Sequence, residues 1–449
     1  MSALGPDARA LLALGVLAAL PGIAVVRSPW RAMPLLSLSF WALSWTWLGD
    51  ASRTRWLHGT LALFAALALL RLARPGPLSR PRGPQLLVAA LGAALLLPFA
   101  VWPVAPGTRM PLESAATLIL SWRESWPPSF EPLWPIPFHA SGVATLAADV
   151  TLLSGAPAHR AALLVALAGG SALVLGLWSL SATVLPAGAA AALAAAAALL
   201  SAAPPGTGPG ALAAALAAQA AALWRGHGGK PSAFAVGACA AAAIAVHPTT
   251  GAAALALAFI GTSLLPPSRR AVPRRGRVAV ATGLVLVAPV LLRAGVDAPQ
   301  LGPLLSLGLT ACVLCAARRA ALARPARGHP RAAPLFAAAV IAAAAARAAA
   351  VTRSTGRALP SPDALAAMEW IRDHARPLDV VCAAAGRVSE WVPAVSGRRT
   401  IVSATPAGPR QAACAFGISV DGEAGGGAAM GAPAFRTRSS EVWTSHGSR

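Results

Sequence analysis

The segment at residues 106–140 gathers side chains that could carry out a group-transfer reaction. A carboxylate could deprotonate an acceptor hydroxyl, and guanidinium groups could hold a phosphate leaving group through charge-assisted hydrogen bonds. An indole face could stack on a sugar ring or shield a lipid chain. These residue types predict transfer of a group from a lipid-borne phosphate to an acceptor at a membrane surface. The candidates in this segment are Arg109, Glu113, Arg123, Glu124, Trp126, Glu131 and His139.

Two further candidates lie downstream of this segment. Asp149 falls in an apolar stretch, where an ionisable side chain is costly and marks a functional position by default. The alternative is a structural role for Asp149 as the partner of His159 or Arg160. His247 precedes Pro248 between two apolar runs, and its alternative is a capping or packing role.

The candidates of the 106–140 segment have simpler interpretations too. Glu113 could be a solvated loop acid, and Glu124 could neutralise the adjacent Arg123. Arg109 and Arg123 could contact lipid headgroups instead of a substrate phosphate. A lone histidine such as His139 is more often a capping or packing residue than a catalyst.

The composition indicates an integral membrane protein. The chain of 449 residues is 56% hydrophobic and only 12% charged, whereas soluble proteins carry roughly 25% charged residues. Apolar runs recur along the chain, and a helix needs about 20 apolar residues to cross a bilayer. A soluble helical protein would show polar stripes at helical spacing, and runs such as Ala187–Leu200 have none. We therefore expect a multi-pass protein.

The distribution of charge predicts an orientation. The net charge is +22, and such a basic balance can indicate nucleic-acid binding. Here the basic residues occupy short connections between apolar runs, so topology explains them and no nucleic-acid partner is expected. Because Lys and Arg stay on the cytoplasmic side, the 15 acidic residues, which avoid these connections, are expected outside. The connections are Arg27–Arg31, Arg71–Arg82, Arg225–Lys230, Arg269–Arg277 and Arg318–Arg331.

The expected fold is an all-α polytopic membrane bundle of about 12 transmembrane helices over residues 1–351, several of them shorter than the roughly 20 residues that cross a bilayer. An outer loop is expected at residues 106–160. Within it, Leu112–Trp122 is expected to form an amphipathic helix at the interface, and Ser141–Ser154 an interfacial or re-entrant helix. The candidate spans are 8–26, 32–48, 56–70, 85–105, 161–185, 186–203, 210–224, 232–246, 249–265, 278–292, 301–317 and 333–351.

A small extracytoplasmic α/β unit is expected over residues 352–421. Ser361-Pro362-Asp363 has the cap, proline and acid of a helix start. Leu378–Ala383 is expected to be a strand, and Trp391–Val402 a turn and a second strand. Cys382 and Cys414 could pair if this region lies outside the membrane. The Gly- and Ser-rich residues 422–449 are expected to be disordered.

Four stretches of the chain resemble the GT-C superfamily, the polytopic membrane glycosyltransferases that use polyprenyl-phosphate sugars, and its uncharacterised bacterial relatives. The resemblance implies an inverting sugar transfer that depends on an acidic residue early in the first large outer loop. Arg109 and Met110 follow the span directly, so Glu113 is the first acid in that loop. The stretches are Trp122–Leu133, Ala147–Val150 with Leu153–Pro157, His247-Pro248, and a looser pattern from Met368 through Pro377 to Arg398.

The sequence therefore predicts an integral membrane glycosyltransferase in the bacterial plasma (inner) membrane, with a lipid-linked sugar donor and membrane lipids as partners. Glu113, Asp149 and Glu124 are the candidate catalytic residues. No metal or cofactor is expected, and the oligomeric state is left open. The alternatives are a polytopic transporter or flippase, and a catalytically inactive membrane scaffold. The candidate substrate-binding residues are Arg109, Arg123, Trp126, Glu131, His139 and His247.

Overall fold

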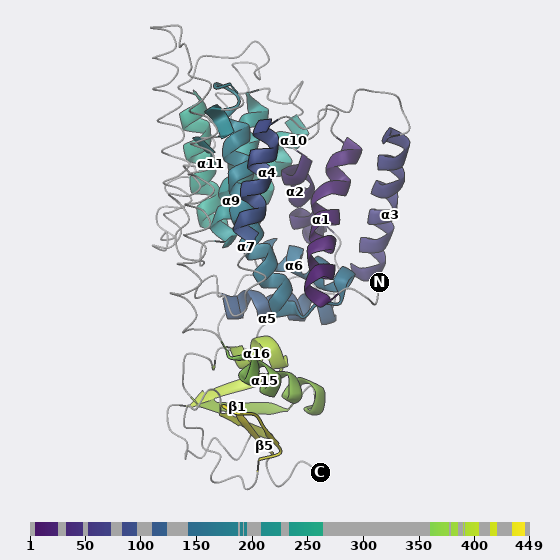
Figure 1. Cartoon of the computed structure of the whole chain (residues 1–449), viewed down its shortest axis with the longest axis vertical. Helices are drawn as coiled ribbons and strands as arrows, with labels where there is room; N and C mark the ends of the chain where they lie inside the picture. Colours follow the sequence, from purple (N-terminus) through teal and green to yellow (C-terminus); the bar gives the residue numbers. More distant parts are fainter. Residues whose placement is uncertain are drawn as a thin grey trace.

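The fold is mostly helical, with one small sheet near the C-terminus. Figure 1 shows a body of upright helices above a separate α/β unit. The predictions for residues 264–359, including the expected spans 278–292, 301–317 and 333–351, lie outside the described residues. The computed structural model describes residues 5–25, 33–47, 53–72, 83–96, 110–123, 142–186, 189–191, 193–194, 208–225, 233–263, 360–376, 379–384, 389, 391–403, 414–419 and 433–444.

The N-terminal part of the body consists of helices that overlap the predicted spans 8–26, 32–48, 56–70 and 85–105; the last of these spans continues beyond the described residues. α1 and α2 pack against each other through buried Leu17 and Trp41, and the Trp41 Nε1–H donates to the Leu17 carbonyl at 3.0 Å. Pro21 removes a backbone donor inside α1, and the adjacent Gly22 N–H donates to Ser37 Oγ at 2.7 Å. The helices are α1 (Pro6–Val25), α2 (Met33–Trp47), α3 (Arg53–Leu72) and α4 (Gly83–Leu96).

The centre of the body is built from alanine-rich helices at very short separation. A Cβ added at Gly176 of α7 would lie 2.5 Å from the carbonyl oxygen of Ala215 in α9. A Cβ at Gly251 of α11 would clash with the carbonyl of Ala243 in α10. Small residues at such positions allow backbones to approach closely, as they do in helix contacts within membranes. These helices are α7 (Ala158–Ser181), α9 (Gly208–Trp224), α10 (Ala233–Val246) and α11 (Pro248–Ser263).

Two short helices close the end of the body that faces the α/β unit. α5 (Met110–Arg123) runs across this end, as Figure 1 shows, and packs on α6 (Gly142–Ser154) and on α7. Both helices were expected from the sequence. α6 is buried over most of its length, and the Gly142 position lies against Val246, where a Cβ would approach the Val246 side chain to 2.8 Å.

Large apolar side chains point outward from the body as well as inward. The exposed ones belong to α1, α3, α4, α10 and α11, and α3 alone exposes Leu63, Leu67, Leu69 and Leu70. Among the described helices, Pro6–Ile23 and Ala158–Ser181 are long and apolar enough to cross a membrane, and six more are apolar but shorter. The expectation of about 12 spans, taken from the length a bilayer demands, stays a prediction.

The α/β unit contains a five-stranded sheet with the strand order β2-β1-β3-β5-β4. β1 pairs in parallel with β2 and β3, while β5 is antiparallel to β3 and β4. α15 begins as the sequence predicts, because Ser361 Oγ accepts from the Ala364 N–H at 3.1 Å. The elements are α15 (Pro362–His374), β1 (Val380–Ala384), α16 (Trp391–Ser396), β2 (Arg399–Ser403), β3 (Phe416–Ser419), β4 (Phe435–Arg436) and β5 (Glu441–Thr444).

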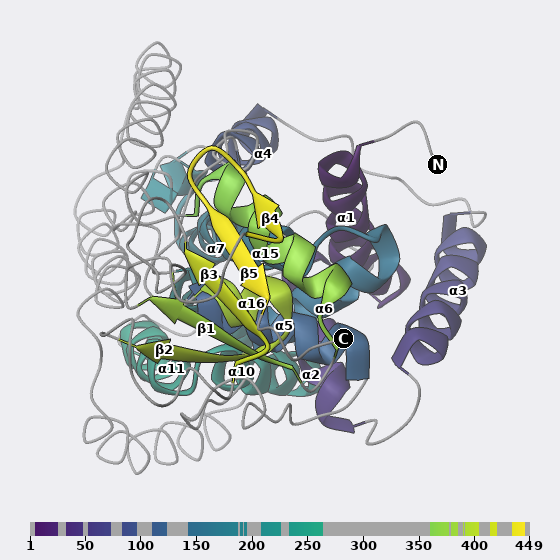
Figure 2. The same cartoon turned by 90° about the horizontal axis from the view of Figure 1, so that it is seen from below.

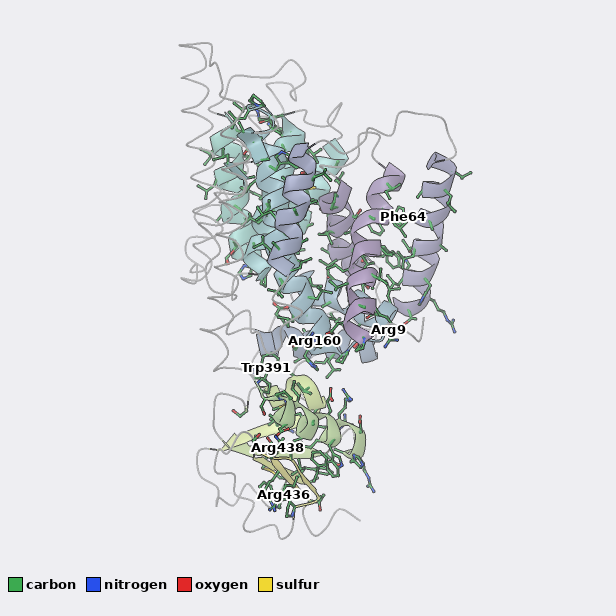
Figure 3. All side chains as sticks on the ribbon, in the orientation of Figure 1. Arg9, Phe64, Arg160, Trp391, Arg436 and Arg438 are labelled. Carbon is green, nitrogen blue, oxygen red and sulfur yellow. A yellow bond between two sulfur atoms is a disulfide. The ribbon has the colours of Figure 1, made fainter. Side chains whose placement is uncertain are left out.

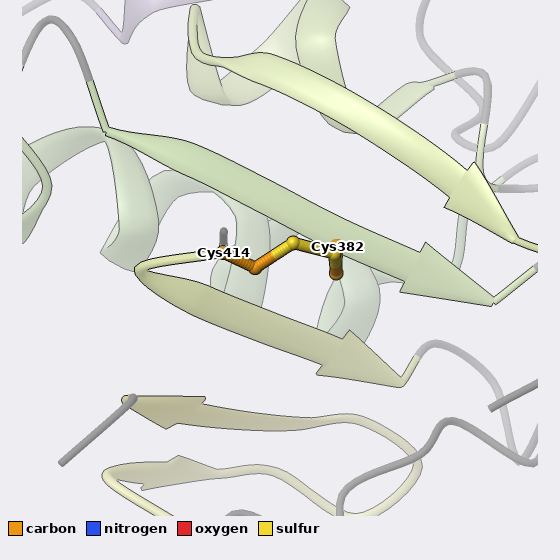
Figure 4. Close-up of a disulfide and its surroundings, with 2 residues drawn as sticks. All are labelled: Cys382 and Cys414. Carbon is orange, nitrogen blue, oxygen red and sulfur yellow. A yellow bond between two sulfur atoms is a disulfide. The ribbon is translucent and has the colours of Figure 1, made fainter. Parts of the chain in front are cut away.

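A disulfide joins β1 to the start of β3. Cys382 and Cys414 are bonded with their Cα atoms 5.7 Å apart (Figure 4), as the sequence suggested for a region outside the membrane. The sheet spans 65 residues of chain, from Val380 to Thr444, because β4 and β5 return to complete it.

Two sequence expectations for this unit need correction. Disorder was expected over 422–449, but β4 and β5 lie in this range and pair with the sheet. Their side chains fit a strand, since Val442 and Trp443 are buried while Arg436 is exposed. Only a turn and a second strand around Ser396-Gly397 were expected in Trp391–Val402; Gly397 has a φ of 64° and β2 follows it, but Trp391–Ser396 also forms the short helix α16, which is buried against α5 and α15.

Candidate functional site

The predicted acids of the α5–α6 region lie at the end of the body that faces the α/β unit. α16 packs on α5 there, and α6 packs on α1 and α7. Figure 2 looks onto this end with the sheet in front of it, and Figure 3 shows Arg9 and Arg160 on the body with Trp391 across the boundary. We call this region the junction: the first turns of α1 and α7, all of α5 and α6, and the adjoining α15 and α16.

Glu113 lies in the first turn of α5 and is 4% exposed. The partial positive charge of a helix N-terminus stabilises a carboxylate in this position. Its backbone carbonyl accepts a hydrogen bond from Thr117 Oγ1 at 2.7 Å. Glu113 is thus a buried helical residue and not the solvated loop acid that the sequence allowed, because α5 packs this face against its neighbours.

Asp149 lies inside α6 and is fully buried. Its chain neighbours Ala148 and Val150 are also fully buried. A carboxylate in apolar surroundings carries a large desolvation penalty unless other groups compensate for it. Glu113 and Asp149 therefore stand on two helices that pack directly on each other and on α7, both inside the junction.

The sequence named His159 or Arg160 as a structural partner for Asp149, and the structure gives Arg160 an ion pair with Asp7. Arg160 Nε donates to Asp7 Oδ1 at 3.1 Å, across 153 residues of chain. The Arg160 side chain is 12% exposed and the Asp7 side chain 45% exposed. This ion pair ties the first turn of α1 to the first turn of α7.

His247 caps the connection between α10 and α11. Its Nδ1 accepts from the Thr250 N–H at 3.4 Å and lies 3.3 Å from Thr249 Oγ1. The side chain is 9% exposed. The geometry favours the capping role that the sequence gave as the alternative to substrate binding, because the ring satisfies a backbone donor at the start of α11.

The remaining predicted residues are not placed by the structure. Arg109, Glu124, Trp126, Glu131 and His139 lie outside the described residues. Arg123 is the last residue of α5, but its side chain is not described. Their assignment to catalysis or substrate binding stays a prediction.

Sequence reasoning missed Asp7 and Arg9, which α1 brings to the junction. Arg9 Nη1 comes within 4.0 Å of a Cβ position built on Gly155, so Arg9 reaches the turn between α6 and α7. Both residues lie in the first turns of the first apolar helix, where charged residues that flank a membrane span are common. Only the fold reveals that they meet Gly155 and Arg160.

Within the described residues, no group of three or more His, Cys, Asp or Glu side chains could hold a metal ion. No protein-family model matches the chain, and neither a curated protein nor a solved structure matches it. The junction offers two buried carboxyl groups on packed helices and guanidinium groups on α1 and α7.

Proposed function

We propose that the protein is a multi-pass membrane glycosyltransferase that takes a sugar from a polyprenyl-phosphate donor at the junction. The single observation that carries the proposal is the position of Glu113 and Asp149 on two packed helices, at the end of an apolar helical body that faces the α/β unit. An enzyme that acts on a lipid-linked donor needs its acid/base groups at the end of its membrane-spanning body, where the donor phosphate lies.

The distribution of apolar side chains supports placement in a membrane. Soluble monomers rarely expose large contiguous apolar patches, yet α3 exposes four leucines and α11 exposes Leu257 and Ile260. The interior holds small and hydroxyl-bearing residues such as Ser39, Thr117 and Ser179 beside its buried leucines and tryptophans. Leucines that face outward, together with small residues at close helix contacts, suit helices surrounded by lipid.

The disulfide supports the proposed orientation. Disulfides persist in oxidising compartments and are rare in the cytosol, so the bond between Cys382 and Cys414 favours an extracytoplasmic α/β unit. Since α16 packs on α5, the junction would lie on the same side. The opposite end of the body holds Arg225, which donates to the Thr262 carbonyl at 3.0 Å and belongs to one of the Arg-rich connections expected inside.

In the proposed reaction, the oxygen of an acceptor hydroxyl attacks the anomeric carbon of the donor sugar. The bond between that carbon and the phosphate oxygen breaks, and the polyprenyl phosphate leaves with the bonding electron pair. A carboxylate, Glu113 or Asp149, takes the hydroxyl proton. An arginine neutralises the charge that develops on the leaving phosphate.

Purified protein in proteoliposomes tests the proposal. Sugar transfer from a polyprenyl-phosphate donor should be detected, and Glu113→Gln or Asp149→Asn should lower kcat by at least about a hundredfold, the lower range for a general base. Glu441→Gln, which removes a partly exposed carboxylate of the α/β unit that pairs with Arg436, should leave transfer unchanged. Full transfer by both site variants would sink the assignment of these residues.

A membrane scaffold is a second candidate, and the burial of both acids favours it. Glu113 is 4% and Asp149 0% exposed, which also suits carboxylates that organise a helix junction. The scaffold predicts no transfer by the wild-type chain in the same assay, and lower thermal stability of the same two variants.

A further inference from the structure

Two arginine side chains lie at the packed first turns of α1 and α7. Arg9 comes from the N-terminal part of α1, and Arg160 lies in the first turn of α7, next to His159. Arg372 of α15 lies close enough to His159 to interact with it electrostatically. Two carboxylates are paired within this group, Asp7 with Arg160 and Asp373 with Arg372.

Arg9 stands out within this cationic cluster. Its Nε atom is buried and has no hydrogen-bond partner within the described part of the chain. A buried donor of a charged group without an acceptor costs free energy, so the site is set to receive an oxygen ligand. A negatively charged group would satisfy it best.

Gly155 provides space beside Arg9. It has a φ of 66°, which favours glycine, and it is exposed. Among the described residues, a side chain added at Gly155 would meet only Arg9 Nη1, at 4.0 Å. The turn between α6 and α7 thus leaves an open position next to the guanidinium group.

An apolar track on α1 continues from this position. Leu12 and Val16 follow Arg9 at spacings of three and seven residues, which places all three on one helix face. Leu12 is 53% and Val16 41% exposed. A cation followed by an exposed apolar stripe matches a molecule with an anionic head and a hydrocarbon tail.

We propose that this cluster binds the phosphate group of a phospholipid, with the acyl chain along Leu12 and Val16 of α1. The phosphate accepts from Arg9, beside the open position at Gly155. The lipid is a bound structural component, so the proposal goes beyond the transfer reaction and rests only on the membrane placement.

The test uses the purified full chain in nanodiscs of phosphatidylcholine with phosphatidylglycerol, and native mass spectrometry to measure retained phosphatidylglycerol. Arg9→Gln should weaken retention roughly tenfold, the effect of losing one charge-assisted hydrogen bond. Asp7→Asn should strengthen retention, because it removes a negative charge beside the site and leaves the Arg160 charge available to the phosphate. Arg55→Gln removes the same charge at an exposed position of α3 and should change nothing.

Two further arms separate the sources of the ligand. Diacylglycerol in place of phosphatidylglycerol should not be retained, because it lacks the phosphate. Inorganic phosphate at the lipid's concentration should not displace the lipid, because it lacks the acyl chain; displacement would show that the site takes free phosphate and would overturn the lipid proposal.

Equal retention of phosphatidylglycerol by wild type, Arg9→Gln and Arg55→Gln would also overturn the lipid proposal. A failure of the membrane placement is distinguishable, since then no variant would enter the nanodiscs. Circular dichroism melting of each variant checks that the fold is kept.

Discussion

Arg398 shows how one buried cation fixes the end of a helix. Its Nη2 donates to the carbonyl of Ala375 at 2.7 Å and to that of Arg372 at 2.8 Å, and its Nε also reaches Ala375 at 3.2 Å. These carbonyls end α15 and would otherwise lack partners. Burial lowers the pKa of Arg398 and nearby Asp379 raises it, and a guanidinium stays charged in proteins.

Arg398→Lys should destabilise α15. A lysine keeps the charge but loses the planar fork of donors, and the loss should be about 1.5–3 kcal/mol for hydrogen bonds from a charged group. Hydrogen exchange of the α15 amides should be faster in the full-length variant. The neighbouring Arg399 is exposed, so Arg399→Lys should exchange like wild type; equal protection in both variants would contradict the capping role.

At the level of single residues, local signals in the sequence predicted capping roles better than they predicted which distant residues contact each other. Ser361 was predicted to cap α15 and does so, because this signal lies within four consecutive residues. The pair of Asp7 and Arg160 spans 153 residues, and no local pattern indicates it. The Ser396-Gly397-Arg398 stretch entered through family resemblance, whereas its contacts give Arg398 a role in ending a helix.

At the level of elements, the approach of α10 and α11 is set by glycine. Gly251 has no room for a Cβ against the Ala243 carbonyl, while Gly237 on α10 has nothing within 4 Å of its Cβ position. A Gly→Ala substitution at Gly251 and at Gly237 therefore separates the effect of helix packing on stability from the effect of helix propensity.

Gly251→Ala should destabilise the protein by about 1–3 kcal/mol through overpacking. Gly237→Ala should stabilise it by up to about 1 kcal/mol, because alanine is the better helix former. Thermal unfolding of the two variants in the same detergent measures the difference. Opposite signs are expected, and a stabilising Gly251→Ala would show that α10 and α11 do not pack as closely as described.

Helices were easier to predict than strands for a physical reason. α1, α5, α6 and α10 lie within a few residues of their predicted bounds, since their apolar runs are long and local. β4 and β5 have two and four residues, too few for an alternating pattern to stand out among Gly and Ser. β5 pairs with β3 and β4 pairs with β5, and no local pattern in the sequence predicts these contacts.

At the level of the whole molecule, sidedness links the separate observations. The acids of the junction, the disulfide-bonded α/β unit and the cationic cluster all lie at one end of the apolar body. The expected cytoplasmic connections belong to the other end, where Arg225 is described. If this end faces the exterior, the junction can reach a lipid-linked donor, and the disulfide of the α/β unit lies in an oxidising environment.

Paired fusions after Arg449 test this arrangement most directly. Alkaline phosphatase is active only when exported, and green fluorescent protein exported in unfolded form does not fluoresce. The account predicts an active phosphatase fusion and a dark fluorescent fusion in the same cells. A bright fluorescent fusion with inactive phosphatase would place the α/β unit and the junction in the cytosol, and would contradict the account.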